Sequence, residues 1–106
     1  MIVSLGCDIV EIARIERKLE KLTSKVLSTD ELKLYQNFSS KKRKIEFVAG
    51  RFAAKEAIIK AYPTAIKMTD INISYQNDKP LCNLKNIKVT ISHENNYAIA
   101  FAILTE

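Results

Sequence analysis

The chain has 106 residues, of which 47% are apolar and 27% are charged, so we expect one globular domain covering residues 1–106. It has no run of about 18 apolar residues and no basic n-region at its start, which argues against a transmembrane helix and a signal peptide. We therefore expect no membrane association and a cytoplasmic location. There, Cys7 and Cys82 are predicted to be reduced, small core residues.

The net charge of +5 is unevenly distributed along the chain. Residues 1–60 contain 13 Lys/Arg and 8 Asp/Glu, whereas residues 61–106 contain four of each. The whole excess therefore lies in the N-terminal part, which indicates an anionic partner such as nucleic acid, a phosphorylated ligand or an acidic protein. A solvated surface that only aids solubility is the alternative.

The predicted elements begin with a buried strand at residues 2–7, where Gly6 indicates that another segment approaches the backbone closely. Apolar residues at positions 12, 15, 19 and 22 predict an amphipathic helix. A second helix is predicted to start near residues 28–30, and the longest helix covers roughly 41–62. Strands follow at 70–75, 87–91 and 97–104, with turns at 76–80 and 93–96. This order predicts an α+β fold in which helices, including one long central helix, pack on a mainly antiparallel sheet.

The long helix carries small and charged residues in a helical pattern. A stripe of small residues predicts close packing on a sheet or another helix: Gly50, Ala53, Ala54, Ala57 and Ala61. We place four charged residues together on the other side: Arg51, Lys55, Glu56 and Lys60. They are either a solvated face with a Glu56–Lys60 ion pair or a site for a phosphate ligand whose metal ion needs a carboxylate.

Two further residues have alternative interpretations. Asp8, with Glu11 three residues later, loosely matches a capping box and would then only cap the following helix. His93, taken alone, is most simply a structural residue of a turn. Because the chain has one histidine and two cysteines, it cannot form a Cys/His zinc site of the usual spacing. Any metal must be a hard ion held by carboxylates.

Three segments of the chain resemble the holo-acyl-carrier-protein synthases, the short bacterial type of 4′-phosphopantetheinyl transferase. They are Gly6-Cys7-Asp8-Ile9-Val10-Glu11 with its continuation to Glu16, the run from Lys42 through Gly50-Arg51-Phe52-Ala53-Ala54-Lys55-Glu56-Ala57 to Lys60-Ala61, and Ile91-Ser92-His93 followed by Tyr97-Ala98-Ile99-Ala100. Their order and spacing suit the family over nearly the whole chain.

The resemblance implies Mg²⁺-dependent transfer of the phosphopantetheine arm of coenzyme A to a serine of apo acyl carrier protein, in fatty acid biosynthesis. It implies that Asp8 and Glu56 hold the metal, with Lys60 beside it as a pyrophosphate contact and a catalytic residue that relays a proton. It also assigns the phosphates of coenzyme A to Lys42, Arg43, Arg51 and His93. The general base is left open between Glu56 and a metal-associated water.

The resemblance further implies a homotrimer with each active site at a subunit boundary. Acyl carrier proteins are acidic, and the family presents a basic first helix to them, which would here consist of Arg14, Arg17, Lys18 and Lys21. Two loops differ from the family pattern. Tyr62-Pro63-Thr64-Ala65 replaces a glycine-rich turn, and Asp78-Lys79-Pro80 replaces Gly-Lys-Pro.

The alternatives to an enzyme are a basic RNA-binding protein and a non-catalytic homologue that only binds a partner. The RNA-binding hypothesis lacks the stacking aromatics expected of such a surface, because the chain has no Trp and only four Tyr and four Phe. We therefore expect no nucleic acid among its partners.

Overall fold

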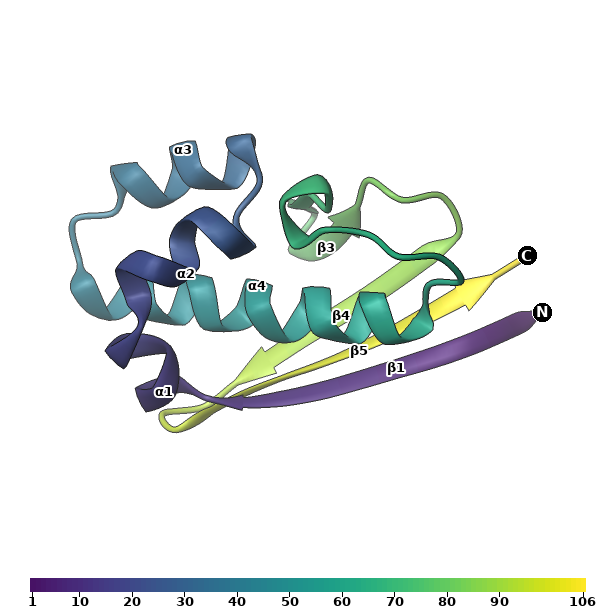
Figure 1. Ribbon diagram of the computed structural model, residues 1–106, viewed down its shortest axis with the longest axis horizontal. Helices are drawn as coiled ribbons and strands as arrows, with labels where there is room; N and C mark the ends of the chain where they lie inside the picture. The colour runs from purple at the N-terminus through teal and green to yellow at the C-terminus, as the bar shows by residue number, and fades with distance from the viewer.

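The computed structural model describes residues 1–106 (Figure 1). One strand, β1 (Ile2–Glu11), precedes all of the helices. The helices are α1 (Ile12–Arg17), α2 (Leu19–Val26), α3 (Thr29–Asn37) and α4 (Lys41–Ala61). A 3₁₀ turn, η1 (Met68–Asp70), then leads to the strands β2 (Ile73–Gln76), β3 (Lys79–Cys82), β4 (Ile87–His93) and β5 (Tyr97–Thr105). None of the helices has the length and apolar character required to cross a membrane.

The strands form two antiparallel sheets. The larger sheet has the order β1-β5-β4, and β2 and β3 form a separate hairpin. Figure 1 shows α4 lying along the three-stranded sheet, with α1, α2 and α3 gathered around its N-terminal half. The predicted α+β fold, with one long helix on an antiparallel sheet, is confirmed.

Small residues bring α4 close to the sheet. The predicted stripe from Gly50 to Ala61 is buried, and it faces the equally buried alanines of β5, Ala98, Ala100 and Ala102. A Cβ atom added to Gly6 would lie 1.9 Å from the backbone oxygen of Ala57. The close approach predicted at Gly6 is therefore confirmed, and the approaching segment is the backbone of α4.

The first predicted helix is interrupted. The backbone leaves the α-helical conformation at Lys18 (φ −122°, ψ 20°), where the N–H of Lys18 donates to the carbonyl of Ile15. This turn redirects the chain, so that Ile15 in α1 and Val26 in α2 are both buried. Further on, α4 is capped by Ser40 and ends at Ala61, because Tyr62 before Pro63 is extended.

The strand boundaries also differ from the sequence-based expectation. β1 continues to Glu11 instead of ending at residue 7, and the expected strand 70–75 is η1 followed by β2. The turn expected at 76–80 is shorter, because Asn77 (φ 52°) and Asp78 (φ 63°) alone reverse the chain. Asn and Asp tolerate this left-handed conformation better than most residues, so the hairpin forms without the glycine of the family pattern.

The two cysteines are free thiols, but Cys7 is not a core residue. Side chains alternate along β1, and Gly6, Asp8 and Val10 point toward α4. Cys7 therefore lies on the opposite, exposed face of the sheet. Cys82 is half-buried, and burial raises the pKa of its thiol.

Candidate active site

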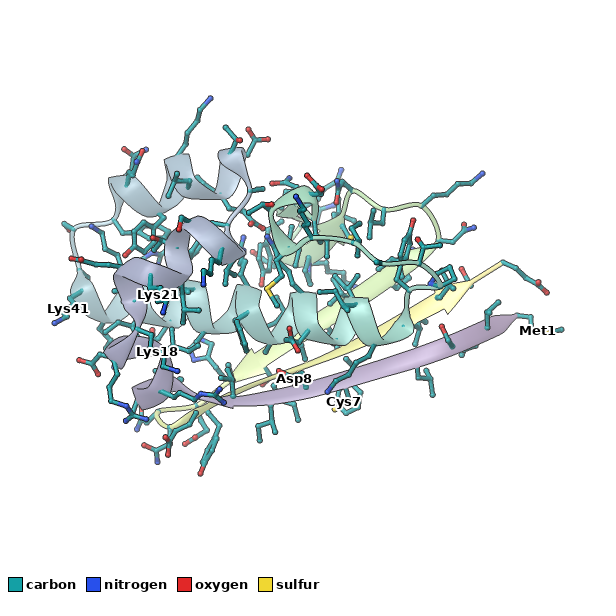
Figure 2. All side chains as sticks on the ribbon, viewed as in Figure 1. Met1, Cys7, Asp8, Lys18, Lys21 and Lys41 are labelled. Atoms are coloured by element: carbon teal, nitrogen blue, oxygen red, sulfur yellow. The ribbon has the colours of Figure 1, made fainter.

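Asp8 projects from the middle of β1 toward α4, where it meets Lys60. The Lys60 ammonium lies 3.2 Å from the Asp8 carboxylate and donates to the backbone oxygen of Cys7 at 2.8 Å. Asp8 lies inside a strand, and the N-cap of α1 is Glu11, which makes no side-chain capping bond. The capping interpretation of Asp8 is therefore wrong, and its carboxylate pairs with Lys60 instead. Figure 2 shows Asp8 beneath α4.

Glu56 lies one turn before Lys60 on α4, and its side chain is half-buried. The expected Glu56–Lys60 ion pair does not form, because Lys60 turns to Asp8 instead. Nowhere do three or more His, Cys, Asp or Glu side chains gather as a metal cage. Mg²⁺ does not require such a cage, because proteins usually bind it through one or two carboxylates together with substrate phosphates and waters. The carboxylates of Asp8 and Glu56 are donors of the kind that such an ion takes.

The four charged residues of α4 do not share one face, which corrects the sequence-based placement. Lys60 reaches β1 and Glu56 is half-buried one turn earlier, but Lys55 is fully buried and Arg51 is only 7% exposed. Lys55 donates to the carboxylate of Glu31 at 2.5 Å, and Arg51 donates to the backbone oxygen of Ile73 at 3.0 Å. Burial lowers the pKa of both bases, and Glu31 opposes the shift. Arg51 and Lys55 are therefore not part of a solvated face.

A second group of predicted residues gathers on the other flank of α4. A hollow of about 170 Å³ is lined by Arg43, Arg51 and His93, together with Glu46, Phe47, Gly50, Tyr75 and Ile91. The Arg51 guanidinium stacks between two rings, 4.0 Å from the centroid of Phe47 and 5.4 Å from that of Tyr75. Two guanidinium groups and an imidazole give the hollow the chemistry of a phosphate site. Phe47 and Tyr75 were not among the predicted residues, and nothing in their local sequence marks them.

The structure separates the predicted site residues into these two groups. Asp8 lies on β1 and His93 on β4, which are the two edges of the sheet, with β5 between them. The hollow around Arg51 includes neither Asp8 nor Glu56 nor Lys60. Lys42 lines a third hollow with Glu16, Ile45, Glu46 and Asn95, among others. One chain therefore does not bring all of the predicted residues into a single pocket.

The four bases predicted to meet a carrier protein, Arg14, Arg17, Lys18 and Lys21, are all exposed. Arg17 makes a weak ion pair with Glu11 at 3.9 Å. A wide hollow is lined by Arg17, Lys18, Lys21 and Lys41 together with Glu16, Leu19 and Glu20. Figure 2 shows Lys18 and Lys21 at the same end of the molecule as Lys41. The break at Lys18 thus places Arg17, Lys18 and Lys21 around a concave, mainly basic surface, which Arg14 does not line.

The chain is similar to known proteins of one family. Residues 4–102 match the model of the 4′-phosphopantetheinyl transferase superfamily. The chain is 49% identical to the holo-(acyl-carrier-protein) synthase of Mycoplasma capricolum subsp. capricolum, over 97% of this chain and 94% of the relative. It is 50% identical to that of Mycoplasma mycoides subsp. mycoides over the same shares.

Solved structures are similar in fold and in sequence. The holo-(acyl-carrier-protein) synthase of Bacillus anthracis, in complex with coenzyme A (3′,5′-ADP), has a TM-score of 0.89 and 36% identity, covering 98% of this chain and 96% of that one. The synthase of Helicobacter pylori, in complex with coenzyme A, has a TM-score of 0.76 and 32% identity, covering 95% and 99%. The chain therefore belongs to the 4′-phosphopantetheinyl transferase superfamily, among the holo-(acyl-carrier-protein) synthases.

Proposed function

We propose that this protein transfers the 4′-phosphopantetheine arm of coenzyme A to a serine of apo acyl carrier protein, with Mg²⁺ as cofactor. The observation that carries the proposal is the contact between Asp8 on β1 and Lys60 on α4, one helical turn after Glu56. Family membership and the coenzyme A complexes of the relatives supply the reaction. Family membership also favours the transferase over an RNA-binding protein.

In the proposed site, Asp8 and Glu56 would hold the Mg²⁺ ion. When bound, the ion would neutralise the charge that develops on the departing adenosine 3′,5′-bisphosphate as the bond between the two phosphates of the pyrophosphate breaks. Lys60 is half exposed and already pairs with Asp8, so its ammonium can move to a phosphate oxygen when the carboxylate takes a metal. The proton of the serine hydroxyl would pass to Glu56 or to a nearby water.

The test is an assay with coenzyme A, purified apo carrier protein and Mg²⁺, followed by the intact mass of the carrier. The expected result is a carrier heavier by one phosphopantetheine group, with one adenosine 3′,5′-bisphosphate released for each group transferred. Binding of coenzyme A and carrier without any mass change would instead indicate a non-catalytic homologue.

The separation of the two groups of residues supports a site that is completed by a second copy of the chain. The outer face of the sheet is apolar and exposed, with exposed fractions of 67% for Leu5, 60% for Ile9 and 53% for Phe101. Cys7 and Phe101 are direct cross-strand partners at its centre. A face of this kind on a soluble protein marks an interface. With the family resemblance, we propose a homotrimer in which Asp8 and Glu56 of one copy face the Arg51 hollow of another.

We expect sedimentation or light scattering to report three times the monomer mass of 12.0 kDa. Phe101→Glu should shift this mass toward that of the monomer and remove transfer activity, because a charge at the centre of the outer face opposes burial. In the wild-type assembly, Cys7 should resist alkylation. An active protein that sedimented as a monomer would rule out the shared site.

The four exposed bases Arg14, Arg17, Lys18 and Lys21, which lie on α1, on α2 and at the junction between them, are proposed to bind the acidic carrier. We expect Arg14→Glu and Lys21→Glu to raise the Michaelis constant for the carrier while leaving coenzyme A binding nearly unchanged. The effect should shrink as salt is added, because exposed charges act mainly by steering the association. Lys85→Glu, which reverses an exposed base before β4, is the matched control. Equal damage to both substrates would show that α1 and α2 support the fold and not the partner.

A further inference from the structure

Glu31 is a buried acid that was not among the predicted site residues. Its side chain is only 1% exposed, although it lies on α3 at the surface of the molecule. Glu31 is the third residue of α3 (position N3) and forms a capping box with the N-cap residue Ser28. The Ser28 side chain accepts from the Glu31 N–H, and Glu31 Oε1 accepts from the Ser28 N–H at 2.9 Å. The Ser-x-x-Glu spacing is a sequence signal that could have identified it.

The two carboxylate oxygens of Glu31 have different partners. Oε1 accepts from Ser28 and from Lys55, whose ammonium also donates to the backbone oxygens of Val26 at 2.6 Å and Met68 at 3.0 Å. These contacts join α2, α3, α4 and η1, which is a structural role. Oε2 instead accepts from the Ile73 N–H at 2.8 Å and lies 3.5 Å from Nε of Arg51.

Glu31, Ile73 and Arg51 thereby form a closed ring. Glu31 accepts a hydrogen bond from the N–H of Ile73, and Arg51 donates one to the carbonyl oxygen of the same residue. The Nε atom of Arg51 is buried and has no hydrogen-bond partner, and Glu31 is the one acid paired with it. Ile73 starts β2, two residues before Tyr75, so the ring sets the position of both Arg51 and Tyr75 in the hollow.

A buried guanidinium needs a nearby negative charge to stay in place. Burial lowers the pKa of Arg51, and the charge of Glu31 is the largest influence that raises it. Without Glu31, the guanidinium would gain by turning toward solvent and leaving the stack between Phe47 and Tyr75. The remaining N–H groups of Arg51 would then no longer be presented together to a phosphate.

We propose that Glu31 is a positioning residue for coenzyme A: it holds the Arg51 guanidinium in the hollow so that this group meets a phosphate of the substrate. The proposal rests on the proposed function, which places coenzyme A against Arg51. Glu31 does not itself touch the substrate and acts through Arg51.

The test is a double-mutant cycle with Glu31→Gln and Arg51→Met, in which the dissociation constant of coenzyme A is measured by calorimetry. Glu31→Gln should weaken coenzyme A binding about tenfold, within the range seen when a positioned group is displaced. Its kcat at saturating coenzyme A and its Michaelis constant for the carrier should stay within about twofold. In the Arg51→Met background, Glu31→Gln should add no further loss.

Ser28→Ala is the matched control, because it removes a cap from the same end of α3, together with the hydrogen bond that Ser28 donates to Asn72, and leaves the Glu31–Arg51 contact itself intact. It should lower the melting temperature without changing coenzyme A affinity. The single variant Glu31→Gln could fail to fold because it leaves the buried Lys55 charge unpaired. In that case the cycle uses the double variant Glu31→Gln/Lys55→Met, in which both charges of the pair are removed. Wild-type affinity in the Glu31 variant, or a loss that adds to that of Arg51→Met, would overturn the proposal. Wild-type affinity in Arg51→Met would overturn the placement of coenzyme A against Arg51, and the proposal with it.

Discussion

Asp8→Asn is expected to lower the turnover of carrier protein by about 10³-fold or more, because it removes a charge that the proposed metal site requires. The asparagine has the same size, so the packing of β1 on α4 should be kept. The substitution also removes the Asp8–Lys60 ion pair, in which the Lys60 side chain is half exposed. Ion pairs of this kind contribute about 1 kcal/mol at most to the free energy of unfolding. The loss should therefore appear in activity and not in the unfolding curve.

The measurement is the initial rate at limiting and at saturating Mg²⁺, beside thermal unfolding of the same samples. Glu56→Gln should behave in the same way, because it supplies the second carboxylate. Asp70→Asn, which neutralises an exposed acid in η1, is the control and should keep the wild-type rate. Near-normal turnover of Asp8→Asn or Glu56→Gln at limiting Mg²⁺ would contradict a metal held by both acids.

Gly6→Ala is expected to destabilise the protein by about 3 kcal/mol, at the upper end of the usual cost of overpacking. The added methyl carbon would lie 1.9 Å from the backbone oxygen of Ala57, and a backbone atom of a long helix cannot move aside alone. β1 would have to move away from α4 as a unit. Such a loss is a large part of the total stability of a small domain, which is about 5–15 kcal/mol. Urea denaturation followed by circular dichroism measures it.

The second glycine of the chain is a matched control with the opposite expectation. A Cβ added to Gly50 would meet only the Cγ2 atom of Ile91, at an ordinary distance of 3.5 Å. Because alanine has the higher helix propensity, Gly50→Ala should raise the free energy of unfolding by up to about 1 kcal/mol. Equal effects of the two substitutions would contradict the close contact between β1 and α4.

The parts of the fold that were predicted correctly depend on signals that are local in sequence. The stripe of Gly50 and alanines on α4, and Gly6 on β1, have very small side chains or none. This feature alone indicated that α4 packs closely on another element and that another segment approaches the strand at Gly6. The end of α4 was likewise predicted from Pro63, to within one residue. The reversal at Asn77-Asp78 was placed in the right loop, but the strand before it was predicted to start too early and β3, the strand after it, was not predicted.

The errors concern residues whose partners are distant in sequence. Arg51 and Lys55 are buried because Glu31 reaches them from another helix, at least 20 positions earlier in the sequence. A helical wheel of α4 contains only the residues of that helix, so it could not reveal this acid. Lys60 pairs with Asp8, 52 positions away, instead of with Glu56 one turn earlier. The division of the candidate site between the two edges of the sheet also follows from strand order, which the sequence pattern did not specify.

In the proposed assembly, Asp8 and Glu56 hold a metal ion on coenzyme A, whose phosphates are bound by Arg43, Arg51 and His93 of a neighbouring copy. The decisive experiment is a crystal structure of the protein with coenzyme A and Mn²⁺, which carboxylates and waters bind as they bind Mg²⁺. We expect one anomalous peak between the Asp8 and Glu56 carboxylates of each copy, with the nucleotide spanning a boundary between copies. A metal peak away from both acids, or coenzyme A bound entirely within one chain, would contradict the proposed assembly.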